Sequence, residues 1–227
     1  EASPNNYSAM LGKANCVFLE GDAEGAKEQI EDILEDRVQD PDCLALLEKV
    51  NISLIKDYEE KLKDNMDRET CFKLGWCYYQ QKEFEKGISL LDNLGEGEDY
   101  DYINLRCRLY LANENYERAY PLTKKWVDLI EKTDDDDTKE MQKRKNRLSL
   151  AHFSVGVCIW ELEYQKKEEE RDKSEFTNAA FYIEKAISEE TNILVKLSYM
   201  EQLARFYLVT EEFEKCIEMC NEIIEKD

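Results

Sequence analysis

Eight cysteines and one histidine, His152, are the residues that could supply nucleophilic, redox or metal chemistry in this sequence of 227 residues. No two cysteines form a C-x-x-C pair, so a zinc site of the Cys/His type lacks its usual spacing. Cys216 and Cys220 stand one helical turn apart and could form half of a metal or redox pair, but the pair lacks partners. Free, packed thiols fit better, because buried Cys behaves as a small hydrophobe. We predict no metal, no cofactor and a reducing, cytoplasmic location.

A catalytic role for His152 would need a nucleophile and an orienting acid nearby. The sequence contains no Gly-x-Ser-x-Gly motif, no phosphate-cradling Gly-rich loop and no His-Glu-x-x-His motif. We therefore interpret His152 as a satisfied core or surface histidine and predict that the protein is not an enzyme.

A run of four aspartates, Asp134 to Asp137, raises the possibility of a calcium site. An EF-hand loop needs ligands at alternate positions, a mid-loop glycine and a distal glutamate, whereas this run is consecutive and has no glycine. We interpret it as a solvated loop that, with Thr138, favours the N-terminus of a following helix. That helix would carry a basic cluster, which either balances the aspartates, as we favour, or binds an acidic peptide. The cluster comprises Lys139, Lys143, Arg144, Lys145 and Arg147.

The chain carries 52 acidic against 31 basic residues, a formal net charge of −21. Nucleic-acid binders present a clustered basic face, so this charge argues against a DNA or RNA partner and against an anionic membrane surface. No stretch approaches the roughly 18 apolar residues of a membrane-spanning helix. The 8 Gly and 3 Pro are too few for the many turns of a β-sandwich or barrel, whereas 13 Tyr, 8 Phe and 3 Trp supply a core. The composition predicts a folded helical protein.

A repeated helical hairpin must position these residues. Between Glu69 and Leu91, apolar residues at helical spacing are interrupted by a polar break and then resume. The signature residues of this segment are Leu74, Gly75, Tyr78, Phe84 and Gly87. A similar pattern recurs 32 residues later and again at the end of the chain, at Cys107, Tyr110, Tyr116 and Ala119, and at Leu203, Ala204, Tyr207, Phe213 and Cys216. Weaker copies include Ala14, Gly21, Ala23 and Ala26 at the start, and Gly156 with Phe176, Ala179, Ile183 and Ala186.

Over nearly its whole length the sequence resembles the tetratricopeptide repeat family. The resemblance implies an all-α fold, a right-handed α-solenoid of antiparallel helix pairs, with about twelve helices. We expect a linker over 1–6 and a single solenoid domain over 7–227, in a fragment of a longer protein. The expected repeat units are about 7–40, 41–66, 68–99, 100–132, 139–190 and 197–227. We expect a helix pair in 41–66, and a charged insertion, 164–174, between the helices of the fifth unit.

The resemblance also implies that partners bind on a concave face lined by the first helices of successive units. The groove residues carried over in this way are Asn15, Phe18, Phe72, Lys73, Trp76, Tyr79, Asn104, Arg108, Phe153, Val157, Trp160 and Arg205. The alternative for the aromatic residues is packing between hairpins, because groove and core lie one residue apart on a helix. Family members that clamp an acidic C-terminus use a Lys where Leu11 stands, so a carboxylate clamp is not expected.

Three function classes remain open from the sequence. The first is a scaffold that binds a protein or peptide segment with apolar or aromatic anchors and a basic rim. The second is a chaperone-associated, co-chaperone-type region of a larger J-domain-like protein, although no His-Pro-Asp triplet occurs here. The third, an enzyme or nucleic-acid regulator on a helical repeat scaffold, is disfavoured by the missing motifs and the net charge of −21.

Overall fold

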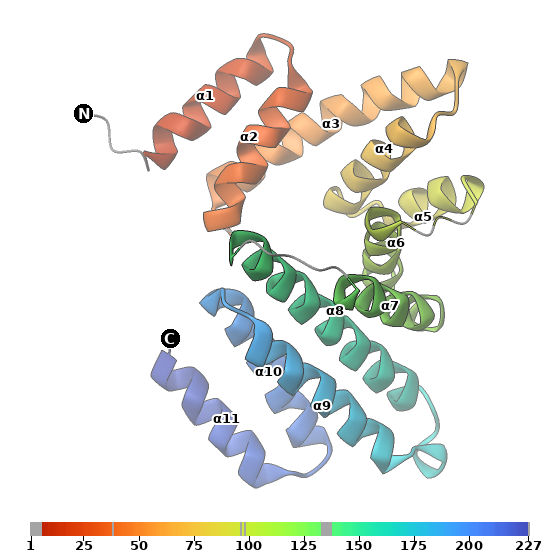
Figure 1. Ribbon diagram of the computed structural model, residues 1–227, viewed down its shortest axis with the longest axis vertical. Helices are drawn as coiled ribbons and strands as arrows, with labels where there is room; N and C mark the ends of the chain where they lie inside the picture. Colours follow the sequence, from red (N-terminus) through yellow and green to blue (C-terminus); the bar gives the residue numbers. More distant parts are fainter. Residues whose placement is uncertain (1–5, 38, 96, 98, 133–137, 227) are drawn as a thin grey trace. The chain divides into compact units, whose positions relative to one another are not determined.

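The computed structural model describes residues 6–37, 39–95, 97, 99–132 and 138–226, and this part of the chain contains eleven α-helices and no strand (Figure 1). The predicted fold class, an all-α solenoid of antiparallel helix pairs, is confirmed. Residues 1–5 of the linker expected over 1–6, and the aspartates 134–137, lie outside the described residues, whereas Asn6 is described and caps the first helix. The helices are α1 (Tyr7–Leu19), α2 (Ala23–Asp36), α3 (Pro41–Asp64), α4 (Arg68–Gln80), α5 (Phe84–Asn93), α6 (Tyr100–Ala112), α7 (Tyr116–Glu131), α8 (Thr138–Tyr164), α9 (Lys173–Glu189), α10 (Ile193–Val209) and α11 (Phe213–Lys226), with a short 3-10 helix, η1, at Glu168–Glu170.

Short polar side chains mark the helix starts. At eight helices the residue before the first turn is Asp or Asn, and its side chain accepts a hydrogen bond from a backbone N–H of that turn. Such a cap satisfies a donor that has no partner within the helix, and is typically worth about 1 kcal/mol. The capping residues are Asn6, Asp22, Asp40, Asp67, Asp99, Asn115, Asp172 and Asn192.

The chain divides into two compact units, residues 1–96 and 97–227. In the first unit, one hydrophobic core joins α1 to α4, with Ile30, Val50 and Leu74 among its buried side chains. The core of the second unit is centred on α7 to α10 and includes Trp126, Ile183 and Phe206. The single domain expected over 7–227 stays a prediction.

The expected helix pair in 41–66 is wrong. A single helix, α3, runs from Pro41 to Asp64 without interruption. Neither Gly nor Pro follows Pro41 in this helix, and its buried residues form one continuous row at helical spacing. Asn51 in the middle of that row is buried and donates a hydrogen bond from Nδ2 to Oε1 of Gln80 at 2.9 Å, so a polar residue here does not mark a turn. The described chain consequently has eleven α-helices in place of about twelve.

The expected insertion in the fifth unit is confirmed as the connection between α8 and α9. Arg171 holds this connection by donating hydrogen bonds to the carbonyl oxygens of Tyr164 and Lys166.

One member of the basic cluster, Arg144, donates hydrogen bonds to the carbonyl oxygens of Ile130 and Glu131 at 3.0 and 2.9 Å. Arg144 thereby satisfies acceptors at the C-terminus of α7, a structural role that adds to the two considered from the sequence.

The eight cysteines are free thiols, of which Cys16 and Cys220 are exposed. Burial raises the pKa of the Cys158 thiol to about 12, and it also raises that of Cys107, so at neutral pH these groups are unreactive thiols. We expect a thiol reagent to modify Cys16 and Cys220 rapidly in the native protein, and all eight thiols in denaturant without prior reduction. Mass spectrometry of the modified chain counts the thiols modified in the native protein and those modified in denaturant. Fewer than eight modified thiols in denaturant would contradict the free-thiol assignment.

Candidate functional site

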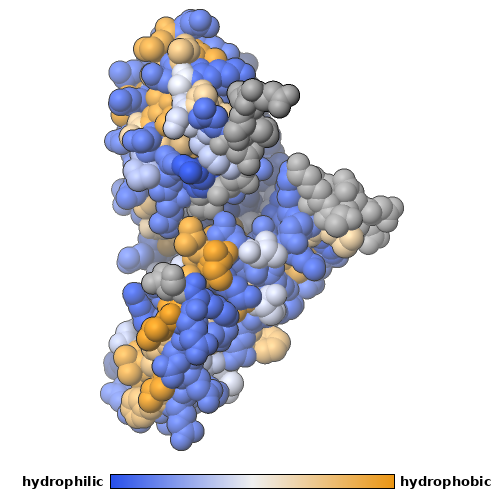
Figure 2. Space-filling view, turned by 90° about the vertical axis from the view of Figure 1, so that its left-hand side faces the viewer, coloured by the Kyte–Doolittle hydropathy of each residue, from blue (hydrophilic) through white to orange (hydrophobic). Residues whose placement is uncertain are grey.

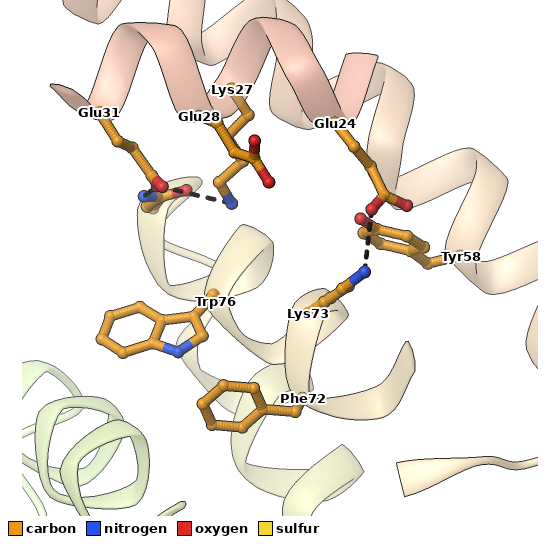
Figure 3. Close-up of a pocket in the computed structure, with 9 residues that line it drawn as sticks. Glu24, Lys27, Glu28, Glu31, Tyr58, Phe72, Lys73 and Trp76 are labelled. Carbon is orange, nitrogen blue, oxygen red and sulfur yellow. Dashed lines mark hydrogen bonds and ion pairs between the residues drawn. The ribbon is translucent and has the colours of Figure 1, made fainter. Parts of the chain in front are cut away.

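A cleft of about 400 Å³ lies in the first unit, with residues of α2 on one side and residues of α4 on the other (Figure 3). Tyr58 of α3 also lines it, beside Glu24. Charged side chains from α2 and aromatic side chains from α4 face the same space. The lining residues are Glu24, Lys27, Glu28, Glu31, Tyr58, Phe72, Lys73, Trp76 and Gln80.

The helical pattern of α2 explains why its wall is charged. Ala23, Ala26, Ile30 and Ile33 are buried in the core of the unit. Those four occupy one side of the helix at i, i+3 and i+4 spacing, which leaves the charged residues 24, 27, 28 and 31 on the adjoining side. The surface that α2 presents to the cleft is therefore polar.

The wall formed by α4 is largely aromatic. Phe72 and Trp76 lie in edge-to-face contact, with ring centroids 6.3 Å apart, and Trp76 and Tyr79 do so at 5.7 Å. Phe84, the first residue of α5, continues the row at 6.1 Å from Tyr79. All four side chains are half-buried, so each keeps some surface that could contact another molecule. Aromatic rings supply large apolar area in a defined geometry, which suits them to anchor a partner side chain.

Two side-chain bridges span the cleft. Lys73 Nζ lies 2.9 Å from Oε2 of Glu24, and Gln80 Nε2 donates to Oε1 of Glu31 at 3.0 Å. Lys27 on α2 lies 3.9 Å from the carboxylate of Glu31. These bridges set the spacing of the two walls, but each pair is partly exposed and surface ion pairs typically contribute only about 0–1 kcal/mol. An incoming charged group could therefore replace them at small cost.

Electrostatic interactions keep the cleft charged at neutral pH. The hydrogen bond from Lys73 holds the pKa of Glu24 below its usual value, and the same hydrogen bond raises the pKa of Lys73. Burial, followed by the adjacent Glu24 carboxylate, raises the pKa of Tyr58, so its hydroxyl stays protonated. Glu28 is exposed, and no ion pair to it is found among the described residues. The lining includes three carboxylates and two ammonium groups, and both lysines already have acidic neighbours.

Three of the predicted groove residues, Phe72, Lys73 and Trp76, line this cleft, and Tyr79 lies next to it in the aromatic row. The predicted residues of α1 do not line the cleft. Asn15 is exposed, and Phe18 packs against the core of the unit. The residues of α2 and α3 that line the cleft were not among those predicted from the sequence.

The uninterrupted helix α3 explains that omission. Successive helices of such an array alternate in direction, so helices two apart in order lie on the same side. With a helix pair in 41–66, α1 and α4 would have shared a side. With one helix there, α2 and α4 share a side instead. The signal available in the sequence was the absence of Gly and Pro between 42 and 64.

The predicted groove residues of the second unit have varied environments. Asn104 accepts a hydrogen bond from Nε of Arg108 at 2.8 Å. Phe153 is half-buried and stacks on Tyr199 of α10, with ring centroids 4.0 Å apart. Val157 is half-buried, and Arg205 is exposed.

Trp160 is placed in the core and not on an open surface. Its side chain is 5% exposed and stacks on Phe206 with ring centroids 3.6 Å apart. A third ring, that of Phe176, meets it edge-on at 4.7 Å. For Trp160 the packing alternative therefore holds, because α10 covers the face of α8 that the sequence pattern assigned to the groove.

His152 is a satisfied core histidine. Its ring is 1% exposed, with Nδ1 2.7 Å from Oε2 of Glu189 and Nε2 2.9 Å from Nζ of Lys185. Both ring nitrogens therefore lie within hydrogen-bond distance of side chains of α9. The ring nitrogens are thus occupied in joining α8 to α9. Among the residues with described positions, no group of three or more His, Cys, Asp or Glu is placed to hold a metal ion.

No protein-family model and no curated protein matches this sequence. Solved structures of similar fold do match. MamA (41-end) from Desulfovibrio magneticus RS-1 superposes with a TM-score of 0.55 at 10% identity, covering 99% of this chain and 97% of that one. MamA from MSR-1 gives 0.53 at 15% identity, covering 97% and 94%. Human IFIT1, as a dimer with PPP-AAAA, gives 0.53 at 17% identity, covering 89% of this chain and 46% of that one.

These likenesses establish that the fold is of the tetratricopeptide type. At such low identity they extend to the fold alone. None of the described helices has the length and hydrophobicity that crossing a bilayer requires. On the face drawn in Figure 2, most of the coloured surface is hydrophilic, with smaller hydrophobic patches.

Proposed function

We propose that this chain is a non-enzymatic, protein-binding repeat scaffold, and that the cleft between α2 and α4 holds a segment of its partner. The observation that carries the proposal is the pairing of two chemistries in one cleft of about 400 Å³: aromatic side chains on one wall and carboxylates on the other. A peptide with an apolar or aromatic side chain next to a Lys or Arg matches both walls. The tetratricopeptide-type fold supports the proposal, since such arrays present extended binding surfaces.

The aromatic wall would supply most of the affinity. Trp76 is half-buried and lines the cleft together with Phe72. Binding energy at interfaces concentrates in a few desolvated aromatic contacts, each of which can be worth about 2 kcal/mol or more. Trp76 is therefore the proposed anchor for the partner.

The acidic wall would supply orientation and a faster association. Glu28 is exposed, and Glu24 and Glu31 lie on the same side of α2. The net charge of −21 extends the same preference beyond the cleft, because it attracts a basic segment at long range. A basic rim around the apolar anchor of the partner satisfies both requirements.

The cleft argues against the co-chaperone alternative. A carboxylate clamp needs an excess of cations, whereas the lining of this cleft holds three glutamates against two lysines. The net charge likewise disfavours a nucleic acid as partner. The free cysteines support a cytoplasmic location.

A displayed peptide library selected on the immobilised chain tests the proposal. We expect selected peptides to carry an aromatic or aliphatic residue near Lys or Arg. Trp76→Ala should weaken binding of a selected peptide by about tenfold or more, equal to about 1.4 kcal/mol. Glu28→Lys should weaken it several-fold through slower association, and added salt should slow association while leaving dissociation nearly unchanged.

Asp57→Lys is the matched control. Asp57 is exposed on α3 and does not line the cleft, so this variant has the same net charge as Glu28→Lys but keeps every lining residue. Long-range attraction falls equally in both variants, and only Glu28→Lys should show an additional loss. Circular dichroism confirms that each variant is folded. Selected peptides that bind Trp76→Ala and Glu28→Lys as tightly as the parent chain would overturn the assignment of the cleft.

A further inference from the structure

A second hollow of the first unit, of about 410 Å³, adjoins the cleft and shares one residue with it. Its walls are the first half of α3 and the end of α4 with the turn that follows. Both helices are interior to the unit, with described helices before and after them in the chain. Gln80 lines both the cleft and this hollow. We call it the amide hollow, after the side-chain amides of Asn51, Gln80 and Gln81 that line it.

Gln80 connects the two spaces through its side-chain amide. Its Oε1 accepts a hydrogen bond from Nδ2 of Asn51 at 2.9 Å, and its Nε2 donates to Oε1 of Glu31, across the cleft, at 3.0 Å. Trp76, the proposed anchor, precedes Gln80 by one turn of α4, or about 6 Å along the helix. A segment held at Trp76 would reach the amide hollow within about two extended residues, because each such residue spans about 3.3 Å.

Two amide oxygens of the hollow accept no hydrogen bond from the described residues. Asn51 is 1% exposed, and its Oδ1 has no partner among them. Gln81 is half-buried, and its Nε2 donates to the backbone oxygen of Glu48 at 3.1 Å, which leaves its Oε1 as a second open acceptor. Buried polar atoms are nearly always paired, so an unpaired acceptor in the lining of a hollow fits a donor supplied by a bound molecule.

The charges of the hollow balance. Glu48 and Lys82 are exposed, and neither forms an ion pair with another described residue. One carboxylate and one ammonium group give no net preference for a charged ligand, unlike the acidic wall of the cleft. Leu44, which is 44% exposed, adds an apolar surface. The ligand that fits is neutral, carries N–H donors and has some apolar area, and the main chain of an extended peptide has all three properties.

We infer that the amide hollow binds the main chain of the same partner segment that the cleft holds, so that the binding surface of the first unit continues along α3 past Gln80. This assignment rests on the proposed function of the cleft and adds the part of the partner that the cleft does not reach. The open amide oxygens accept hydrogen bonds from main-chain N–H groups, whatever the side chains at that end of the partner. The partner segment is accordingly extended for about four residues beyond its anchor.

Three synthetic peptides, each with a fluorescent label, test the inference on the full chain. The core peptide has an aromatic residue between two lysines, to match the cleft, and two longer peptides add four alanines on its N-terminal or its C-terminal side. Alanine adds main chain with almost no side-chain chemistry. We expect one extension to tighten binding by about tenfold, as measured by fluorescence anisotropy, and the other to change it by no more than about twofold.

A fourth peptide separates main-chain from side-chain recognition. It is the tighter-binding extended peptide with its added alanines replaced by lactic acid, so that esters take the place of amides and the N–H donors are lost. We expect it to bind no more tightly than the core peptide, because the open acceptors of the hollow then receive no hydrogen bond.

Two variants locate the extension. Gln81→Ala removes an open acceptor and keeps every residue of the cleft, so the extended peptide should lose most of its gain while the core peptide binds as before. Gln81 is preferred to Asn51 because Asn51 is buried and its replacement would also disturb the core. Gln29→Ala is the matched control: Gln29 is also half-buried, lies on α2 and lines neither space, so both peptides should bind it as they bind the parent chain. Trp76→Ala should weaken both peptides by the same factor, and circular dichroism confirms that each variant is folded.

The outcomes separate a failure of this inference from a failure of the proposed function. If neither extension tightens binding, or if the ester peptide keeps the gain, the amide hollow does not take the main chain of the partner, although a core peptide that depends on Trp76 still supports the cleft. A gain that survives Gln81→Ala places the extension elsewhere and also overturns the inference. A core peptide that does not bind, or that binds Trp76→Ala equally well, contradicts the proposed function, and the inference falls with it.

Discussion

Trp160→Ala is expected to lower the free energy of unfolding of the second unit by about 3–5 kcal/mol, the usual range for removing a buried aromatic side chain. Trp160 is 5% exposed, and its ring stacks on Phe206 at 3.6 Å and meets Phe176 edge-on at 4.7 Å. Its removal would leave a cavity at the point where α8, α9 and α10 meet. Urea unfolding followed by circular dichroism measures the loss as an earlier midpoint.

Trp160→Phe and Trp76→Ala are the controls for this experiment. The Phe variant keeps an aromatic ring against Phe206, so it should lose distinctly less free energy of unfolding than the Ala variant. Trp76 is only half-buried, so removing its side chain should cost less stability than removing that of Trp160. Trp160→Ala would contradict the core placement if it unfolded at the parental midpoint while losing binding to a partner peptide. That outcome would restore the groove role predicted for Trp160 from the sequence.

Trp160 illustrates where prediction from the sequence stops. Phe153, Val157 and Trp160 lie at helical spacing, so the sequence correctly places them along one stripe of a helix. Which part of that stripe is covered depends on a neighbouring helix more than 30 residues away. Phe206 of α10 lies over Trp160, whereas Phe153 stacks on Tyr199 and stays half-buried. Local spacing fixes the stripe, and tertiary packing decides its exposure.

The helices themselves were predictable because their signals are local. Asp and Asn caps, helical spacing of apolar residues and the hairpin signature at Leu74, Gly75 and Tyr78 all act within a few residues. The cleft was only half predictable. Its α4 wall followed from the repeat signature, but its α2 wall depended on whether 41–66 contained one helix or two. This one decision changes which helices of the first unit share a side.

Gly156→Ala is expected to lower the free energy of unfolding of the second unit by about 1–3 kcal/mol or more, as extra volume in a packed core usually does. A Cβ at Gly156 would lie 2.7 Å from Cγ1 of Ile183 and 2.8 Å from the carbonyl oxygen of Ala179. The carbonyl belongs to the backbone of α9, and Ile183 is fully buried, so neither neighbour can move aside without separating α8 from α9. The sequence pattern had assigned Gly156 to the small position of a first helix, and this close approach is the reason a small residue is needed there.

Gly12→Ala makes the same chemical change, but we expect it to raise the free energy of unfolding, whereas Gly156→Ala should lower it. Gly12 is exposed in α1, and a Cβ there would meet no atom within 4 Å. Because Ala is the better helix former, this variant should raise the free energy of unfolding of the first unit by about 0.5–1 kcal/mol. Ala at position 156 gains the same helix propensity, so the measured difference between the two variants isolates the cost of pushing α8 and α9 apart. Urea midpoints of the two variants and the parent chain give that difference. If Gly156→Ala were as stable as the parent, α8 and α9 would not approach as closely as these distances state, and the helix crossing at Gly156 would have to be revised.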